Sequence, residues 1–126
     1  MFPLCADQKI GVLPWSPLAR GKLTRDWDEK TNRSEKDEFG KTLYSAESAD
    51  RAVADAVRVI AEGRGVPRAQ VALAWVRSNS VVSAPIVGAS KPQHLHDAVS
   101  SLELTLTPEE KTELENPYVP HEIAGY

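Results

Sequence analysis

The stretch that decides the fold is GVLPWSPLARG, residues Gly11–Gly21. The apolar run Ile10–Leu13 overlaps its beginning and is typical of a short buried strand. Pro14 and Pro17 end that strand, because proline has no N–H group to donate to a β-ladder. We therefore predict a strand that stops in a rigid corner and continues as a loop.

The composition is typical of one compact domain or of part of a larger one. The chain has 126 residues, of which 41% are hydrophobic and 26% charged, and its formal net charge is −3. These values show no clustered basic excess for nucleic acid, and no apolar stretch approaches the roughly 20 residues of a membrane span. The single cysteine, Cys5, cannot form an internal disulfide and is predicted to pack as a small apolar residue. We expect a cytoplasmic protein that has no nucleic-acid or membrane partner.

The rest of the chain alternates between helical and extended patterns. A connection without sustained periodicity runs from Pro14 to about Tyr44. Two helices are predicted next. One covers Ser45–Glu62, with Ser45 or Ser48 as its cap and Gly63 and Gly65 at its end, and the other begins at Pro67 and is buried on much of its surface.

A second strand is predicted at Val81–Val87, and two more helices follow it. The apolar face of the first comprises Leu95, Ala98, Val99 and Leu102, and the second begins with Thr107 as cap, Pro108 in the first turn and Glu110 closing a capping box. Strands that alternate with helices imply parallel pairing. Two parallel strands alone leave both edges open, so the elements indicate a fragment whose other strands lie upstream or on another chain.

The stretch PIVGASKPQHLHDAV, Pro85–Val99, combines a small-residue turn with a helix start. The free N–H groups and positive dipole of that helix start favour a phosphate, and Lys91 adds positive charge. Spacing alone favours the simpler alternative, in which Ser90 is the N-cap and Gln93 its N3 partner. The two readings are compatible, because a capping serine can also contact a ligand.

Solvent exposure explains the other polar residues better than a metal-binding or catalytic role does. His94 and His96 point to different faces of a helix and His121 lies in the tail, so we predict solvated histidines and no metal site. The carboxylates of Asp26, Asp28 and Glu29 fit a solvated loop better than a general acid–base pair. The sequence contains no recognisable pairing of a nucleophile with a base.

Both unusual segments follow a predicted strand directly. In a (β/α)8 barrel the loops after the strands gather on one face, and the loops after strands 7 and 8 frequently build a phosphate site there. We therefore predict that PWSPLARG and VGASKP lie side by side.

At these residues the chain resembles the C-terminal part of an aldo-keto reductase, from the end of barrel helix 6 onward. The stretches that carry the resemblance are GVLPWSPLARGKLTR, SEKDEFGKTLY, VALAWVRSNSVVSAPIVGASKPQHLHDAV and LELTLTPEEKTELE. The resemblance implies an α/β fold, a partial (β/α)8 TIM barrel made of the last two β/α units with parallel strands and extra helices. Residues 1–126 would then be the C-terminal portion of one oxidoreductase domain, with no second domain.

The family reduces aldehydes and ketones to alcohols with NADPH, so the resemblance implies a site for NADP(H). The residues implied to line the cofactor near its nicotinamide and pyrophosphate are Ser16, Pro17 and Leu18, continued by Arg20 and Gly21. Those that match the segment at the adenosine 2′-phosphate are Gly88, Ala89, Ser90 and Lys91, with His94 where the family often has Arg or Gln. Asp97 and Ala98 fall where many members place Glu-Asn against adenine, and the alanine departs from that pattern.

No catalytic residue is carried over from the family. Its catalytic Asp, Tyr, Lys and His come from the first half of the barrel, and Tyr44 does not lie in their context. We therefore expect the chain to be inactive alone, with Met1 as a truncated or internal start, and a small carbonyl compound as the substrate of the complete enzyme. The substrate pocket would draw on Trp27, Phe39, Tyr118 and Tyr126, for each of which packing is an equal alternative.

Two alternatives to an oxidoreductase part are open at the level of sequence. One is a non-catalytic module that binds a nucleotide or pairs with an upstream barrel fragment. The other is a truncated, non-functional product.

Overall fold

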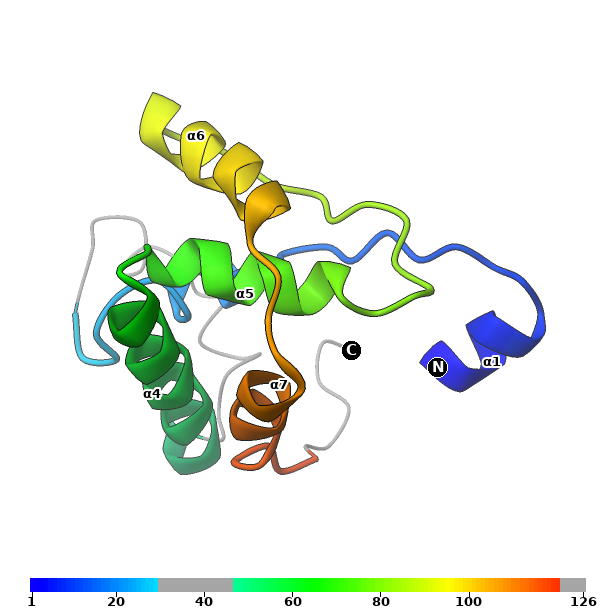
Figure 1. Cartoon of the computed structure of the whole chain (residues 1–126), viewed down its shortest axis with the longest axis horizontal. Coiled ribbons are helices and arrows are strands. Elements are labelled where there is room, and N and C mark those ends of the chain that lie inside the picture. The colour runs from blue at the N-terminus through cyan, green and yellow to red at the C-terminus, as the bar shows by residue number, and fades with distance from the viewer. Residues whose placement is uncertain (30–46, 121–126) are drawn as a thin grey trace.

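The computed structural model describes residues 1–29 and 47–120. These residues are mainly helical (Figure 1). The elements in chain order are α1 (Phe2–Asp7), the 3-10 turn η1 (Ala19–Gly21), α4 (Glu47–Arg64), α5 (Arg68–Arg77), α6 (Pro92–Ser100), the 3-10 turn η2 (Ser101–Glu103) and α7 (Pro108–Glu115). Within the described ranges, no helix has the length and hydrophobicity of a membrane span.

Helix α5 lies at the centre of the packing. Its residues 71–74 are all buried, which requires cover on every side and confirms the prediction from the sequence. Helices α4 and α6 pack against it, and α4 also contacts α7 (Figure 1). The buried cluster between α4, α5 and α7 comprises Val57, Ile60, Ala61, Val71, Ala74, Leu106 and Leu114.

The helix ends differ slightly from the predicted ones. Helix α4 runs to Arg64, so Gly63 is still helical, and the chain leaves the helix at Gly65, whose φ is +64°. Pro67 is the N-cap of α5 rather than its first helical residue, because its ψ of 142° is extended. The candidate cap Ser45 lies outside the described residues.

The start of α7 confirms the predicted capping box. Thr107 Oγ1 accepts a hydrogen bond from the Glu110 N–H at 3.3 Å, and Glu110 Oε2 accepts one from the Thr107 N–H at 2.7 Å. The Arg64 guanidinium also donates to both carboxylate oxygens of Glu110, at 2.6 and 2.7 Å. Glu110 therefore caps α7 and joins its start to the end of α4.

The two predicted strands do pair in parallel, but only through isolated bridges. The bridges join Val12 to Val82 and Trp15 to Ile86. Val12 and Trp15 are three residues apart in the first segment, whereas Val82 and Ile86 are four residues apart in the second. The second segment therefore contains one extra residue between the two bridges. Pro14 and the extra residue interrupt the regular ladder, which corrects the expectation of two continuous strands.

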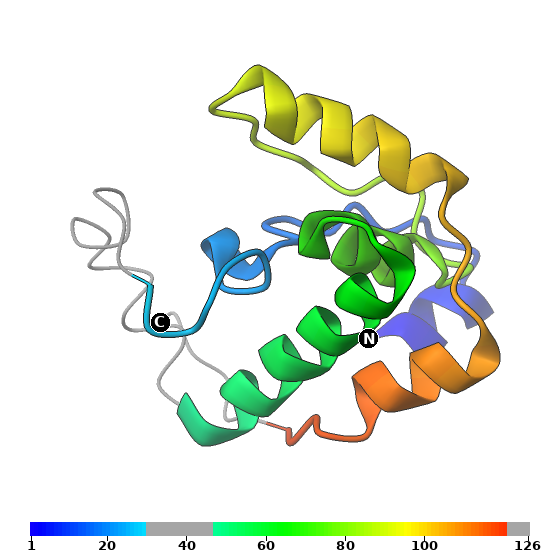
Figure 2. The same ribbon diagram turned by 60° about the vertical axis from the view of Figure 1, so that its left-hand side comes forward.

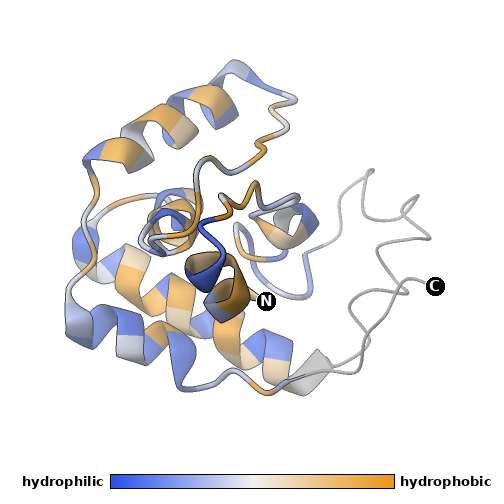
Figure 3. Cartoon of the chain, turned by 90° about the vertical axis from the view of Figure 1, so that its right-hand side faces the viewer, coloured by the Kyte–Doolittle hydropathy of each residue, from blue (hydrophilic) through white to orange (hydrophobic). Residues whose placement is uncertain are grey.

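Helix α6 does not bury its predicted apolar face. Asp97 and Ala98 lie half-buried, and Ser101, the residue after the helix, is buried. Leu95, Val99 and Leu102 are each more than half exposed. Figure 3, coloured by hydropathy, shows hydrophobic positions along α6 as well as on the helices of the core.

Helix α1 lies at the opposite end of the two paired segments from α6 (Figure 1). Within it, Cys5 is buried as a free thiol, as predicted. The Ile10 N–H donates to the Cys5 carbonyl at 2.8 Å, which turns the chain from the helix into the first segment.

Candidate functional site

The two loops predicted to lie together emerge from the same end of the paired segments. The Val12 N–H donates to the Val81 carbonyl at 2.7 Å, and the Ile86 N–H donates to the Pro14 carbonyl at 2.9 Å. Because the segments are parallel neighbours, the loop after Trp15 and the loop after Ile86 start side by side. Figures 1 and 2 both show the two segments running alongside each other.

The first loop has an unusual backbone. Ser16, Ala19 and Arg20 have φ values of 53°, 47° and 54°, in the left-handed region that non-glycine residues rarely adopt, and Gly21 follows at 92°. Each such non-glycine conformation costs on the order of 1 kcal/mol, and such residues cluster at ligand-binding sites.

Local hydrogen bonds hold this backbone in place. The Ala19 N–H donates to the Ser16 carbonyl at 2.9 Å, and the Gly21 N–H donates to the Leu18 carbonyl at 2.8 Å. The Ser16 hydroxyl accepts from the Arg20 N–H at 3.2 Å. The loop is therefore a compact turn that starts directly at the end of the first segment.

Two cations in this loop lie over indole rings. The Arg20 guanidinium carbon is 5.7 Å from the ring centroid of Trp15, and the Lys22 ammonium is 4.3 Å from that of Trp27. Neither contact was predicted from the sequence, because both pairs are five residues apart in a region without periodicity. These contacts keep positive charge at the loop while packing it on apolar surface.

The loop is fixed to the helices beyond it. Leu23 packs against the buried cluster. Asp26 accepts a hydrogen bond from Arg68 at 2.7 Å, which lowers the pKa of that carboxyl, and Asp28 pairs with Arg51. The carboxylates are exposed, as predicted, but these two also anchor the loop to α5 and α4.

The second loop remains open to solvent. Gly88, Ala89, Ser90 and Lys91 are all exposed. The N-cap of α6 is Lys91, no side chain caps this helix, and the first helical residue is Pro92. The predicted N-cap at Ser90 and its Gln93 partner are therefore wrong, because the N-cap lies one residue further along the chain than predicted. The Gln93 side-chain amide donates to the Asp97 carboxylate instead, at 2.9 Å.

The histidines of α6 face solvent, as the sequence predicts. The Nδ1 of His94 lies 3.4 Å from the Ser90 hydroxyl, and the Nδ1 of His96 lies 3.5 Å from the Ser100 hydroxyl. His121 lies outside the described residues. In the part of the chain that the structure describes, no group of three or more His, Cys, Asp or Glu side chains is arranged to hold a metal ion.

The candidate site therefore has two adjacent parts. The first loop holds Ser16, Pro17 and Leu18 half-buried beside the Arg20 turn, and the second presents Lys91 at an uncapped helix start. An uncapped helix start with an adjacent cation can bind a phosphate group. Of the aromatic pocket candidates, Trp27 is half-buried and Tyr118 exposed, whereas Phe39 and Tyr126 lie outside the described residues.

Comparison of the sequence with known proteins shows the protein family to which the chain belongs. A sequence profile of the aldo/keto reductase family matches residues 1–118. The chain is 40% identical to versiconal hemiacetal acetate reductase from Aspergillus parasiticus, over 98% of this chain and 36% of that protein. It is 39% identical to a putative aryl-alcohol dehydrogenase from Schizosaccharomyces pombe, over 99% of this chain and 35% of that protein.

A solved structure shares the fold. The glycerol dehydrogenase from Gluconobacter oxydans superposes with a TM-score of 0.73 at 26% sequence identity, covering 98% of this chain and 39% of that chain. The chain thus belongs to the aldo/keto reductase family of oxidoreductases, and it spans about a third of the length of the curated relatives it matches.

Proposed function

We propose that this chain is the NADP(H)-binding part of an aldo-keto reductase that reduces small aldehydes or ketones to alcohols. In this proposal residues 1–126 form the C-terminal portion of one oxidoreductase domain, equivalent to the last two β/α units of a (β/α)8 barrel with extra helices. A cytoplasmic location belongs to the same proposal. The observation that carries it is the parallel pairing that brings the two predicted cofactor loops together.

The described residues fit the phosphate groups of such a cofactor. Pro92 has no N–H and the His94 N–H donates to the Lys91 carbonyl at 3.0 Å, so the first turn of α6 offers the Gln93 N–H. No side chain caps this helix start, its dipole end is positive, and Lys91 is exposed there. Gly88, Ala89, Ser90 and His94 would share the contact with the 2′-phosphate. Because this phosphate distinguishes NADPH from NADH, Lys91 would favour NADPH.

The first loop would form the other wall of the site. Ser16, Pro17 and Leu18 would lie along the nicotinamide and pyrophosphate, and Arg20 and Gly21 would continue that wall. The left-handed residues support this role, because a turn held in strained conformations by its own hydrogen bonds presents the same surface before and after binding. When bound, NADPH supplies the hydride for carbonyl reduction.

The chain would not complete the reaction alone. The resemblance implies that the family's proton donor and its partners would come from the first half of the barrel, outside the two β/α units proposed for this chain. The purified chain should therefore not turn over an aromatic aldehyde with NADPH above a no-protein control.

Fluorescence titration with NADPH and NADH tests the proposed cofactor site. We expect Lys91→Gln to weaken NADPH binding about tenfold, because one charge-assisted contact is lost, and to leave NADH binding unchanged. Ser90→Ala should weaken NADPH binding without changing the melting temperature, because Ser90 caps no helix.

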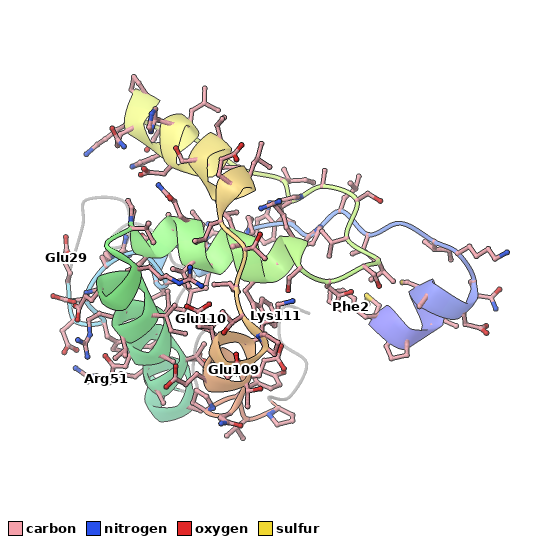
Figure 4. All side chains as sticks on the ribbon, in the orientation of Figure 1. Phe2, Glu29, Arg51, Glu109, Glu110 and Lys111 are labelled. Carbon is pink, nitrogen blue, oxygen red and sulfur yellow. The ribbon has the colours of Figure 1, made fainter. Side chains whose placement is uncertain are left out.

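The matched control is Lys111→Gln, which removes the same charge from α7, the helix where Figure 4 labels Lys111. It should bind both nucleotides as the unmodified chain does. The proposal is wrong if the chain binds neither nucleotide, or if Lys91→Gln and Lys111→Gln weaken NADPH binding equally.

A further inference from the structure

Three cations lie in or just after the strained turn of the first loop, and two of them lie over indole rings. Arg20 lies over Trp15, and Lys22 lies over Trp27. The third cation, Arg25, is half-buried, and its Nε is shielded from solvent without a hydrogen-bond partner in the part of the chain that the structure describes. A buried N–H group without a partner destabilises a fold, so Arg25 has a donor group that a ligand can satisfy.

The guanidinium of Arg25 lies against Gly21. A Cβ atom built on Gly21 would be 2.7 Å from Nη1 of Arg25, so the guanidinium occupies the space that another side chain would fill. Gly21 also has a φ of 92°, in the region that favours glycine. The end of the turn is therefore covered by the side chain of Arg25.

The backbone of this turn has already used its donors. The N–H groups of residues 19–24 all donate to acceptors within the loop. The N–H and the hydroxyl of Thr24 both donate to the Gly21 carbonyl, at 3.1 and 2.9 Å. An anion held at this turn therefore needs a cationic side chain.

Two carboxylates that follow Arg25 in the sequence are engaged with other arginines. Asp26 accepts a hydrogen bond from Arg68 of α5 at 2.7 Å, and Asp28 pairs with Arg51 of α4. These pairs direct the two carboxylates toward the helices, which leaves the charge of Arg25 for a ligand at the turn.

We propose that Arg25 binds the diphosphate of the dinucleotide at the Gly21 end of the first loop. This inference rests on the proposed function, in which Gly21 continues the wall along the pyrophosphate. A guanidinium presents a planar fork of N–H donors that matches phosphate oxygens, and it is always charged. Arg25 acts on the diphosphate that NADPH and NADH share, whereas Lys91 acts on the 2′-phosphate that only NADPH carries.

Fluorescence titration of Arg25→Gln with both nucleotides tests this assignment. We expect the dissociation constants of NADPH and NADH to rise by the same factor, about tenfold, because a charge-assisted contact to a shared group is lost. Lys91→Gln should raise only that of NADPH, and the control Lys111→Gln should raise neither. Arg25→Lys should bind both nucleotides with intermediate affinity, because lysine keeps the charge but lacks the fork.

Inorganic pyrophosphate provides a measurement without a nucleotide. A ligand that binds the folded chain raises its melting temperature, so pyrophosphate should stabilise the unmodified chain and Lys111→Gln more than Arg25→Gln. Without ligand, Arg25→Gln should melt within about 2 °C of the unmodified chain, because Arg25 Nε has no partner among the described residues. This comparison separates the loss of a ligand contact from the loss of the fold.

The two measurements also separate this inference from the proposed function. The assignment of Arg25 is overturned if Arg25→Gln binds both nucleotides as tightly as the unmodified chain, or if Lys111→Gln weakens them equally. If the chain binds neither nucleotide, the proposed function is wrong and pyrophosphate decides alone. Stabilisation that depends on Arg25 then supports the assignment, and stabilisation that does not depend on Arg25, or none at all, overturns it.

Discussion

Two glycines near the end of α4 differ only in backbone conformation. Gly63 is helical and Gly65 has a φ of +64°, and a Cβ atom added at either would meet nothing within 4 Å. Crowding therefore plays no part at either position. The left-handed conformation at Gly65 is the reason why a glycine ends this helix.

Alanine substitutions at these glycines should have opposite effects. Gly63→Ala should raise the free energy of unfolding by about 0.5–1 kcal/mol, because alanine is the better helix former. Gly65→Ala should lower it by about 1–2 kcal/mol, because alanine is strained in the left-handed region. Urea denaturation of the two variants checks this, and a shared sign would contradict the assigned end of α4.

At the scale of elements, α4 and α7 meet at one carboxylate. Glu110 accepts hydrogen bonds from the Arg64 guanidinium and from the Thr107 N–H, and these contacts, the Arg64 bonds above all, hold the pKa of Glu110 below its ordinary value of 4.5. A carboxylate whose folded-state pKa is lowered stabilises the fold above its unfolded pKa, and this contribution is lost as the pH falls through the folded value.

Replacing Glu110 by glutamine should therefore reduce the loss of folding stability at acidic pH. Glutamine retains the capping geometry but not the charge. We expect Glu110→Gln to melt about 2–4 °C lower than the unmodified chain at pH 7, and to lose less further stability as the pH is lowered from 7 to below the ordinary glutamate pKa of 4.5. Thermal melts across this range, with Glu113→Gln on the same helix as control, check the assignment. The control should keep the acid dependence of the unmodified chain.

At the scale of the whole molecule, the buried residues concentrate between α4, α5 and α7. Leu114 is 6% exposed within this cluster, whereas Leu102, in η2 beside α6, is 56% exposed. The stability of the chain therefore depends on the three-helix cluster rather than on the paired segments that carry the candidate site.

Alanine variants of these two leucines should differ strongly. Leu114→Ala should lower the free energy of unfolding by about 2–5 kcal/mol, because it leaves a cavity in the cluster, whereas Leu102→Ala should change it by no more than about 0.5 kcal/mol. Circular dichroism melts, with hydrogen exchange to follow α4 and α5, give the comparison. Equal losses would place the main core elsewhere.

Structural features that depend on spacing within one helix were predicted better than features that depend on the surrounding structure. The capping box of α7 and the burial of α5 follow from spacing within a single helix, and both were predicted correctly. The cap of α6 was not, because Ser90-x-x-Gln93 fits a capping box in sequence while the helix starts one residue later. For the candidate site, the adjacency of its two loops was predicted, but the left-handed turn at Ser16–Gly21 was not.

The sequence by itself determined the helices, the parallel order of the two apolar segments and the family resemblance, because each depends on short-range periodicity, proline positions and motif. Only the tertiary structure decided how those parts meet. The extra residue near Pro85 reduces the expected strands to two bridges, and the α6 stripe of Leu95 and Val99 faces outward. Apolar periodicity predicts which face of a helix is suited to burial. Whether that face is buried depends on the elements that pack against it, and the described residues leave this face of α6 exposed.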